Sequence, residues 1–394
     1  MTPYNMSRKP AKQYFFLMPL VWLGSWIMTR QFKLKIDKSQ MKKVKPPFLV
    51  IATHQGFSDY YIGPLAVFPH RAMYVSDMEG FAAFGNWLYR GLGCIPKRRF
   101  VSDVSVVKNI RYGLLKKQSV FIYPEARHSN VGITAYIPKN IAKFAKAMNH
   151  PVVILSTNGS YLANPFWDEE HTRKIKITAK MECICSKEEL ETISTEDLQK
   201  TIEEKLKYDE YRYQQTKGYL IKEKFRANGL HNALYQCKNC KSLYDMDSAG
   251  TKLFCNKCNS TWELSEDGWL IDNYNDKTHI PDWYEWQRSE AIKSIEKLPL
   301  EFEVKIEALP NEFGFVDLGK GKLVFTKNEF VLSFENSELH FPHKTRESVQ
   351  TEYNYRGKGK CLVLSTRDCC YYVYSKNKNF SPTEIQFIGE YLFR

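Results

Sequence analysis

Residues 46–60 read PPFLVIATHQGFSDY. The run FLVIAT follows two prolines and is rich in β-forming residues, so it predicts a buried strand. Polar residues come directly after it, and α/β proteins usually place their chemistry at such strand ends. This stretch therefore predicts both an α/β fold and the position of a site within it.

His54 and Asp59 are the two residues of this stretch that suggest catalysis. On a continuous helix five residues advance by roughly 500°, which would leave the two side chains about 140° apart. The chain must turn between them if they are to cooperate. Gly56 permits a turn, and Ser58 or Asp59 is a suitable cap for a helix beginning near Tyr60.

The following residues continue this alternation of strands and helices. The chain has 394 residues and 43% hydrophobic content, enough for two or three folded domains. Up to about Cys185 the pattern is typical of a layered α/β domain with a mixed sheet and flanking helices. Ser102 is the predicted cap of the second helix. The expected strands are 48–53, 72–76, 119–125, 151–157 and 174–184, and the expected helices are 81–93, 101–117 and 139–149.

The second half of the chain changes character. Residues 186–230 are charged and favour helices, and Pro281 with Asp282 predicts the start of a further helix. From about residue 300 the pattern is β-rich, and it ends in a helix capped by Ser381; this element order resembles the pleckstrin-homology-like architecture. The predicted units are a membrane-anchoring segment (1–33), the α/β domain (34–230), a cysteine module (231–270), a helical linker (271–299) and a β-rich C-terminal domain (300–394).

The N-terminal segment is strongly basic around an apolar core. The net charge is +13, and residues 1–45 contain ten Lys or Arg but one acid, Asp37. The apolar run YFFLMPLVWLGSWIM, residues 14–28, would span about 22 Å as a helix, short of the roughly 30 Å of a bilayer core. Pro19 is expected to kink it.

Four interpretations of this run are open: a signal peptide, a full membrane span, a buried core helix and an interfacial or re-entrant anchor. No small-x-small cleavage site follows, and Arg30 arrives at once. Trp22 and Trp26 among basic residues favour the interfacial anchor. We expect membrane association on the cytoplasmic face.

Four of the ten cysteines have metal-binding spacing: Cys237, Cys240, Cys255 and Cys258, as C-x2-C-x14-C-x2-C. This pattern resembles a zinc ribbon and predicts a structural four-thiolate Zn²⁺ site, with iron as the alternative metal. The other cysteines show no disulfide framework, which suits a reducing compartment. Residues 235–269 contain five acidic residues and four lysines, and this balance disfavours a nucleic-acid-binding face.

Three further blocks accompany HQGFSD. They are GCIPKRR (Gly93–Arg99), YPEARHS (Tyr123–Ser129) and HPVVIL (His150–Leu155). Each alone has a plain explanation: a chance H-x4-D pair, a solvated basic surface, a turn-capping glutamate. Together they supply a base, an orienting acid and an anion site, as acyl transfer to the hydroxyl of a phosphorylated alcohol requires.

In order and spacing these blocks resemble those of the glycerol-phosphate and lysophosphatidate acyltransferases, over roughly residues 45–185. The resemblance implies direct transfer without a covalent enzyme intermediate. His54 would be the general base and Asp59 would orient it, as in a serine-hydrolase triad whose serine belongs to the substrate. The acyl donor would be acyl-CoA or acyl carrier protein, and no redox cofactor is expected.

The resemblance also implies the acceptor site, with Arg98 on the acceptor phosphate and Glu125 organising the pocket. The family block runs proline-glutamate-glycine-threonine-arginine-serine, whereas here Ala126, Arg127 and His128 follow Glu125. This departure leaves the acceptor headgroup open. Cys94 is expected to be a buried core residue. The predicted substrate-binding residues are Gly93, Lys97, Arg98, Arg99, Pro124, Glu125, Arg127 and His128.

The sequence thus predicts a membrane-associated enzyme that acylates the sn-2 hydroxyl of 1-acylglycerol 3-phosphate in phospholipid synthesis. An alternative acceptor is another lysophospholipid or glycerol 3-phosphate. From a different class, the alternative is an inactive membrane-surface adaptor that works through its zinc ribbon.

Overall fold

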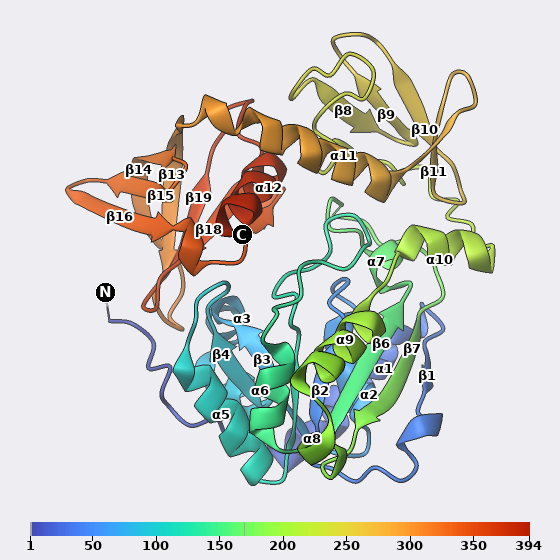
Figure 1. The fold of residues 1–394 in the computed structure, drawn as a ribbon, viewed down its shortest axis with the longest axis vertical. Helices are drawn as coiled ribbons and strands as arrows, with labels where there is room; N and C mark the ends of the chain where they lie inside the picture. Colours follow the sequence, from blue (N-terminus) through green and yellow to red (C-terminus); the bar gives the residue numbers. More distant parts are fainter. Residues whose placement is uncertain (1, 169) are drawn as a thin grey trace.

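Three β-sheets organise the chain in the computed structural model, which describes residues 2–168 and 170–394. Figure 1 shows the first sheet and its helices as one body, with the second and third sheets above it. The α/β class with a separate cysteine-containing module and a β-rich C-terminal region, as predicted, is confirmed.

The first sheet has seven strands in the order β1-β7-β6-β2-β5-β3-β4. Its central strands β6, β2, β5, β3 and β4 are mutually parallel, whereas β7 runs antiparallel to β6, so the sheet is mixed as expected. The strands are β1 (Lys35–Asp37), β2 (Leu49–Ala52), β3 (Ala72–Asp77), β4 (Cys94–Lys97), β5 (Ser119–Ile122), β6 (Val152–Asn158) and β7 (Thr178–Cys185).

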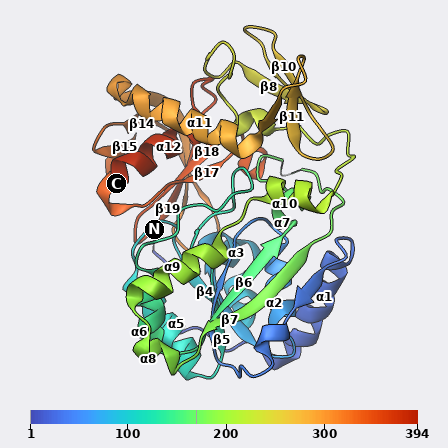
Figure 2. The ribbon, with the colours of Figure 1, turned by 45° about the vertical axis from the view of Figure 1, so that its right-hand side comes forward.

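Helices cover both faces of this sheet, as Figure 2 shows. Because successive strand residues point to opposite faces, Leu49 and Ile51 of β2 pack with α5, α6 and α9, while Val50 and Ala52 pack with α2. The helices of this layer are α1 (Met18–Arg30), α2 (Asp59–Val67), α5 (Val104–Leu115), α6 (Ile141–Met148), α7 (Ser160–Ala163), α8 (Glu189–Thr192), α9 (Thr195–Leu206) and α10 (Glu210–Lys217).

Two helix predictions need correction. The single helix expected over 81–93 is two helices, α3 (Met78–Phe84) and α4 (Asn86–Gly91), because Gly85 lies between them with φ of 79°. The cap of α5 is Asp103 and not Ser102: the Asp103 carboxylate accepts a hydrogen bond from the Ser105 backbone N–H at 2.7 Å.

The cysteine module is built on an antiparallel sheet in the order β12-β11-β10-β9-β8. This sheet continues to His279, beyond residue 270, and α11 (Ile280–Lys293) begins there, one residue before the predicted Pro281. Trp283 of α11 is fully buried against Trp262, with ring centroids 4.8 Å apart. The strands are β8 (Met246–Ala249), β9 (Lys252–Cys255), β10 (Thr261–Leu264), β11 (Trp269–Asp272) and β12 (Lys277–His279).

The C-terminal domain has an antiparallel sheet in the order β16-β15-β14-β13-β19-β18-β17, followed by α12 (Pro382–Phe393). The predicted order of sheet and helix is confirmed, and Ser381 caps α12 by accepting a bond from the Glu384 N–H. The strands are β13 (Leu300–Leu309), β14 (Val316–Phe325), β15 (Glu329–Phe334), β16 (Ser337–Pro342), β17 (Gln350–Glu352), β18 (Cys361–Ser365) and β19 (Cys370–Tyr374).

Residues 2–13, which we call the N-terminal strap, join the first layer to the C-terminal domain. The Tyr4 N–H donates to the Pro310 carbonyl oxygen at 3.0 Å, and the buried Gln13 side chain bonds to the backbone of Ala72 and Leu92. The helix α1 follows the strap, and Pro19 is its second residue. The proline therefore lies in the first turn, where its missing N–H breaks no helical hydrogen bond, and not in the interior, where it would kink the helix. Within the described residues, every helix is too short or too polar to cross a bilayer.

Candidate functional site

The turn after β2 brings His54 and Asp59 together. His54 Nδ1 lies 3.3 Å from Asp59 Oδ2. The same carboxylate oxygen accepts the backbone N–H groups of Gln55, at 2.7 Å, and Gly56, at 3.2 Å. Asp59 therefore holds both the turn and the imidazole. When Nδ1–H donates to Asp59, the lone pair of Nε2 is left to accept a proton.

The other Asp59 carboxylate oxygen, Oδ1, accepts a hydrogen bond from a residue that follows the HPVVIL block. Ser160, at the start of α7, donates from Oγ to Asp59 Oδ1 at 2.8 Å. Its hydroxyl also lies 2.6 Å from Ser58 Oγ, so Ser58 stands at the cap position of α2 without capping its backbone. Sequence reasoning missed Ser160, although the polar run after the strand of the HPVVIL block was an available signal.

Gly56 is needed for close approach. A Cβ built on Gly56 would lie 3.1 Å from the Ser160 carbonyl oxygen and 3.3 Å from that of Asn164. Its backbone does not require the left-handed region. The β2–α2 turn is therefore pressed against α7, which keeps Ser160 within reach of Asp59.

Three rings surround the His54 imidazole. The centroid of His128 lies 4.2 Å away, that of Tyr123 4.5 Å and that of Tyr60 6.1 Å. His54 retains 12% side-chain exposure. Burial, with smaller contributions from His54 and Arg99, holds the pKa of His128 well below its ordinary value, so this second imidazole is neutral. The predicted site residue His128 thus lies against the predicted base.

Glu125 is a buried carboxylate that fastens three segments together. Its Oε1 accepts the His54 backbone N–H at 2.9 Å, and its Oε2 accepts the Ala135 N–H at 2.8 Å and the Tyr208 hydroxyl at 3.0 Å. Burial raises the pKa of Glu125 to about 7, against these hydrogen bonds, which lower it. Glu125 therefore positions the backbone of the residue that carries the imidazole.

We expect Glu125 to give the protein a pH-dependent stability. Its pKa rises from 4.5 to about 7 on folding, so the folded protein holds this proton more tightly than the unfolded chain does. The contribution to stability is full below pH 4.5 and is lost as the pH rises to about 7. Urea unfolding of wild type and Glu125→Gln across this window measures it, because glutamine cannot titrate. If the difference in free energy of unfolding between wild type and Glu125→Gln stays constant with pH, the raised pKa of Glu125 is contradicted.

The GCIPKRR block lies at the boundary with the C-terminal domain. Gly93 has φ of 82°, and a Cβ there would lie 2.9 Å from the Ala72 carbonyl oxygen. Arg98 is buried, and its guanidinium donates to the carbonyl oxygens of Pro310, at 2.7 Å, Asp368, at 2.8 Å, and Arg367, at 3.0 Å.

The two cations beside Arg98 are also engaged. Lys97 Nζ donates to the carbonyl oxygens of Arg98, at 3.4 Å, and Val101, at 3.0 Å. Arg99 forms ion pairs with carboxylates of both domains. The partners of this block are thus protein oxygens, many of them distant in sequence.

The YPEARHS block follows β5 in a tight turn. Ala126, at the position of a glycine in the acyltransferase block that this stretch resembles, has φ of 55°, which a residue with a Cβ adopts at a cost. The adjoining Pro124 precedes Glu125 in this turn. Arg127 is buried and pairs with Glu390 of α12 at 3.1 Å. It lines a polar cavity of about 250 Å³ between this loop, α11 and α12, so its guanidinium is directed toward the C-terminal domain.

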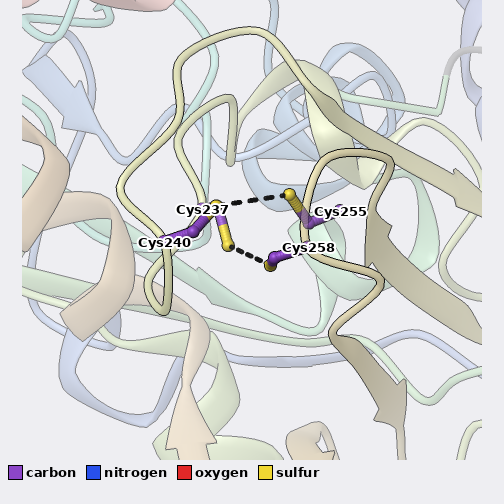
Figure 3. A group of neighbouring side chains, drawn as sticks. All are labelled: Cys237, Cys240, Cys255 and Cys258. Atoms are coloured by element: carbon purple, nitrogen blue, oxygen red, sulfur yellow. Dashed lines mark hydrogen bonds between the residues drawn. The ribbon is translucent and has the colours of Figure 1, made fainter.

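The four predicted metal ligands converge on one point, as Figure 3 shows. Their sulfur atoms all lie within 4.8 Å of one another. Cys237 Sγ lies 3.7 Å from Cys258 Sγ, and Cys240 Sγ lies 3.8 Å from Cys255 Sγ. Four thiolates bound tetrahedrally at about 2.3 Å from Zn²⁺ would be separated by roughly 3.8 Å. The cysteine cluster therefore has the donors and the spacing to bind a metal ion.

One comparison with known proteins, the family model, covers the motif blocks. The family model described as Acyltransferase matches residues 33–157, which include His54, Asp59 and the GCIPKRR and YPEARHS blocks. No curated protein sequence matches the chain. One similar solved structure is the 1-acyl-sn-glycerophosphate (LPA) acyltransferase PlsC from Thermotoga maritima. The two are 19% identical with a TM-score of 0.41, covering 48% of this chain and 76% of that chain.

Proposed function

We propose that residues 33–157, which the Acyltransferase family model matches, form a domain that transfers a fatty acyl group from a thioester to the hydroxyl of a glycerolipid. One observation carries the proposal: within the matched segment, His54 Nδ1 lies 3.3 Å from Asp59 Oδ2. A base oriented by a carboxylate is what activation of a substrate hydroxyl requires. Because Asp59 is fixed by Ser160 and two backbone N–H groups, the imidazole is held in one orientation.

The proposed reaction proceeds without an enzyme nucleophile. The acceptor hydroxyl gives its proton to His54 Nε2 as its oxygen attacks the thioester carbonyl carbon. Asp59 stabilises the imidazolium that forms. The tetrahedral intermediate then collapses, the carbon–sulfur bond breaks, and the leaving thiolate takes the proton from the imidazolium. Neutral His128 beside His54 adds no second positive charge that would oppose protonation of the base.

The donor is proposed to be acyl-CoA or acyl carrier protein. The resemblance implies 1-acylglycerol 3-phosphate as acceptor, with another lysophospholipid or glycerol 3-phosphate as the alternative. Release of free thiol by the protein reconstituted in lipid, with a panel of acceptors, tests the activity. Absence of thiol release with every lysolipid would favour the inactive adaptor that works through the cysteine module.

We propose Zn²⁺ as the metal of the cysteine cluster, with iron as the alternative that the same geometry accepts. All four ligands would come from Cys237, Cys240, Cys255 and Cys258, so the ion would be structural and would have no position for a reactive water. When bound, it joins the two loops that carry these cysteines.

The membrane-facing surface is proposed to be the outer side of α1 and its neighbours. Trp22 packs edge-on against Phe68 at 4.9 Å, and Tyr14 lies 5.9 Å from Trp87, so α1 and the preceding turn adjoin α2 and α4. The exposed Arg30 lies over the Trp26 ring at 5.6 Å and suits anionic headgroups. The exposed apolar residues here, which we call the apolar face, are Phe15, Phe16, Leu20, Leu23, Trp26, Ile27, Phe68 and Trp87.

Charge placed on the apolar face should weaken membrane binding. Leu23 and Ile27 are 53% and 55% exposed, so Leu23→Asp with Ile27→Asp leaves the protein core intact. Burying such a side chain contributes about 1.5–3 kcal/mol, so vesicle binding should fall by at least about tenfold per residue. Leu115→Asp on α5, 66% exposed, is the matched control. Equal vesicle co-sedimentation of both variants would place the contact elsewhere.

A further inference from the structure

The Arg99 guanidinium lies where the α/β domain meets the C-terminal domain. Its Nη2 is 2.7 Å from Asp77 Oδ2 and 3.9 Å from Glu79 Oε1. Its Nη1 is 3.4 Å from Glu352 Oε1, on β17 of the C-terminal domain. One cation is thus shared among three carboxylates, and the third comes from a residue more than half the chain away.

This cluster adjoins the proposed base. Tyr60 lies beside the His54 ring, at 6.1 Å between centroids. Asp77 ends β3 and Arg99 follows β4, and both strands run parallel to the rest of the central sheet, so they reach the same sheet edge at which His54 follows β2. Arg99 also acts on His128, whose ring is 4.2 Å from His54. Arg99 is therefore a predicted acceptor-site cation at the same edge of the sheet as the proposed base.

The other predicted phosphate-binding cations, Lys97, Arg98 and Arg127, already have oxygen partners within the protein. Arg98 donates to three carbonyl oxygens of the C-terminal domain. Arg127 pairs with Glu390 on α12, and Lys97 Nζ is bonded to two backbone carbonyls. A phosphate bound by Arg99 beside His54 would have to compete with the carboxylates that already pair with Arg99.

The charges decide which headgroup such a site accepts. A phosphomonoester carries about −1.5 to −2 charges at pH 7. Two like unit charges about 5 Å apart repel by roughly 3 kcal/mol at the effective dielectric constant of about 20 that suits protein sites. Glu352 adds one such charge beside Arg99, and its Oε1 contacts Nη1 at 3.4 Å, one of the guanidinium nitrogens that a phosphate would need for a bidentate contact.

We infer that Glu352 is a specificity-determining residue, and that it makes the site select a lysolipid acceptor whose headgroup has no net charge over one with a free phosphomonoester. This rests on the proposed acyl transfer, and within it favours the alternative acceptor, another lysolipid, over the 1-acylglycerol 3-phosphate that the resemblance implies. Zwitterionic 1-acylglycerophosphocholine and neutral 1-monoacylglycerol are the probes of the selected class. The phosphomonoester probe is 1-acylglycerol 3-phosphate.

Initial rates of thiol release with these three acceptors test the inference, with full-length protein on phosphatidylcholine vesicles. We expect wild type to have a kcat/KM at least about tenfold higher for an uncharged or zwitterionic acceptor than for 1-acylglycerol 3-phosphate, a difference of about 1.4 kcal/mol. Glu352→Gln, which removes the charge and keeps the shape, should reduce this ratio by about tenfold. Because the ranking uses wild type alone, the inference stays testable if Glu352→Gln does not fold.

Glu390→Gln is the matched control, since Glu390 also joins the C-terminal domain to an arginine of the α/β domain. It should leave the ratio between acceptors unchanged. If both variants raise the rate with every acceptor equally, the contacts only hold the domains closed, and the inference fails. A wild-type preference for 1-acylglycerol 3-phosphate overturns the inference and leaves the acyl transfer standing, whereas absence of thiol release with every acceptor removes both.

Discussion

Replacing His54 by alanine should lower the rate of acyl transfer by about 10²–10⁴ without unfolding the protein. The imidazole is the proposed acceptor of the substrate proton, and its partner Asp59 stays anchored by Ser160 and two backbone N–H groups. The turn therefore survives loss of the ring. Thiol release with saturating donor and acceptor measures the rate, and thermal unfolding checks the fold.

His70→Ala is the control for this experiment, because His70 is an exposed histidine just after α2. Its rate should equal that of wild type. The rate of Asp59→Asn should lie between the rates of His54→Ala and His70→Ala. Asparagine can retain one hydrogen bond but cannot stabilise an imidazolium. If His54→Ala keeps the wild-type rate, the direct base mechanism is wrong.

Replacing Cys237 by serine should abolish stoichiometric metal binding and unfold the cysteine module. Structural zinc contributes about 10–16 kcal/mol of apparent binding free energy in zinc-finger peptides, so its loss exceeds the stability of a small module. Cys237 is fully buried, and Trp262, packed on Trp283, reports on the same sheet. Elemental analysis measures the metal, and tryptophan fluorescence follows the unfolding.

Cys183→Ser is the matched control, because Cys183 is half-buried on β7 and lies outside the cluster. Cys183→Ser should retain the bound metal and the tryptophan fluorescence of wild type. The cysteine module packs on α11, which contacts α12 of the C-terminal domain through Tyr284 and Phe387 at 4.6 Å. We therefore expect Cys237→Ser to loosen this domain as well. Full metal content in Cys237→Ser would refute the four-cysteine site.

Local sequence was sufficient for features that a few neighbouring residues specify. The run FLVIAT marked a strand because its residues are apolar and β-forming, and Gly56 marked the turn that the His54–Asp59 contact needs. The cysteine spacing predicted a cluster because two short turns can each present two thiolates. Predictions that depended on one residue were less secure: Asp103 caps α5 in place of Ser102, one position away.

The sequence by itself determined the α/β layer, the position of the predicted base and the cysteine cluster, because propensity and spacing act over a few residues. Only the tertiary structure decided the partners of Arg98, Arg99 and Arg127. Arg98 bonds to backbone carbonyls 212 to 270 residues away, and every residue has such a carbonyl, so no pattern marks them. Glu352 reaches Arg99 because β17 docks there, and this docking depends on the packing of whole domains.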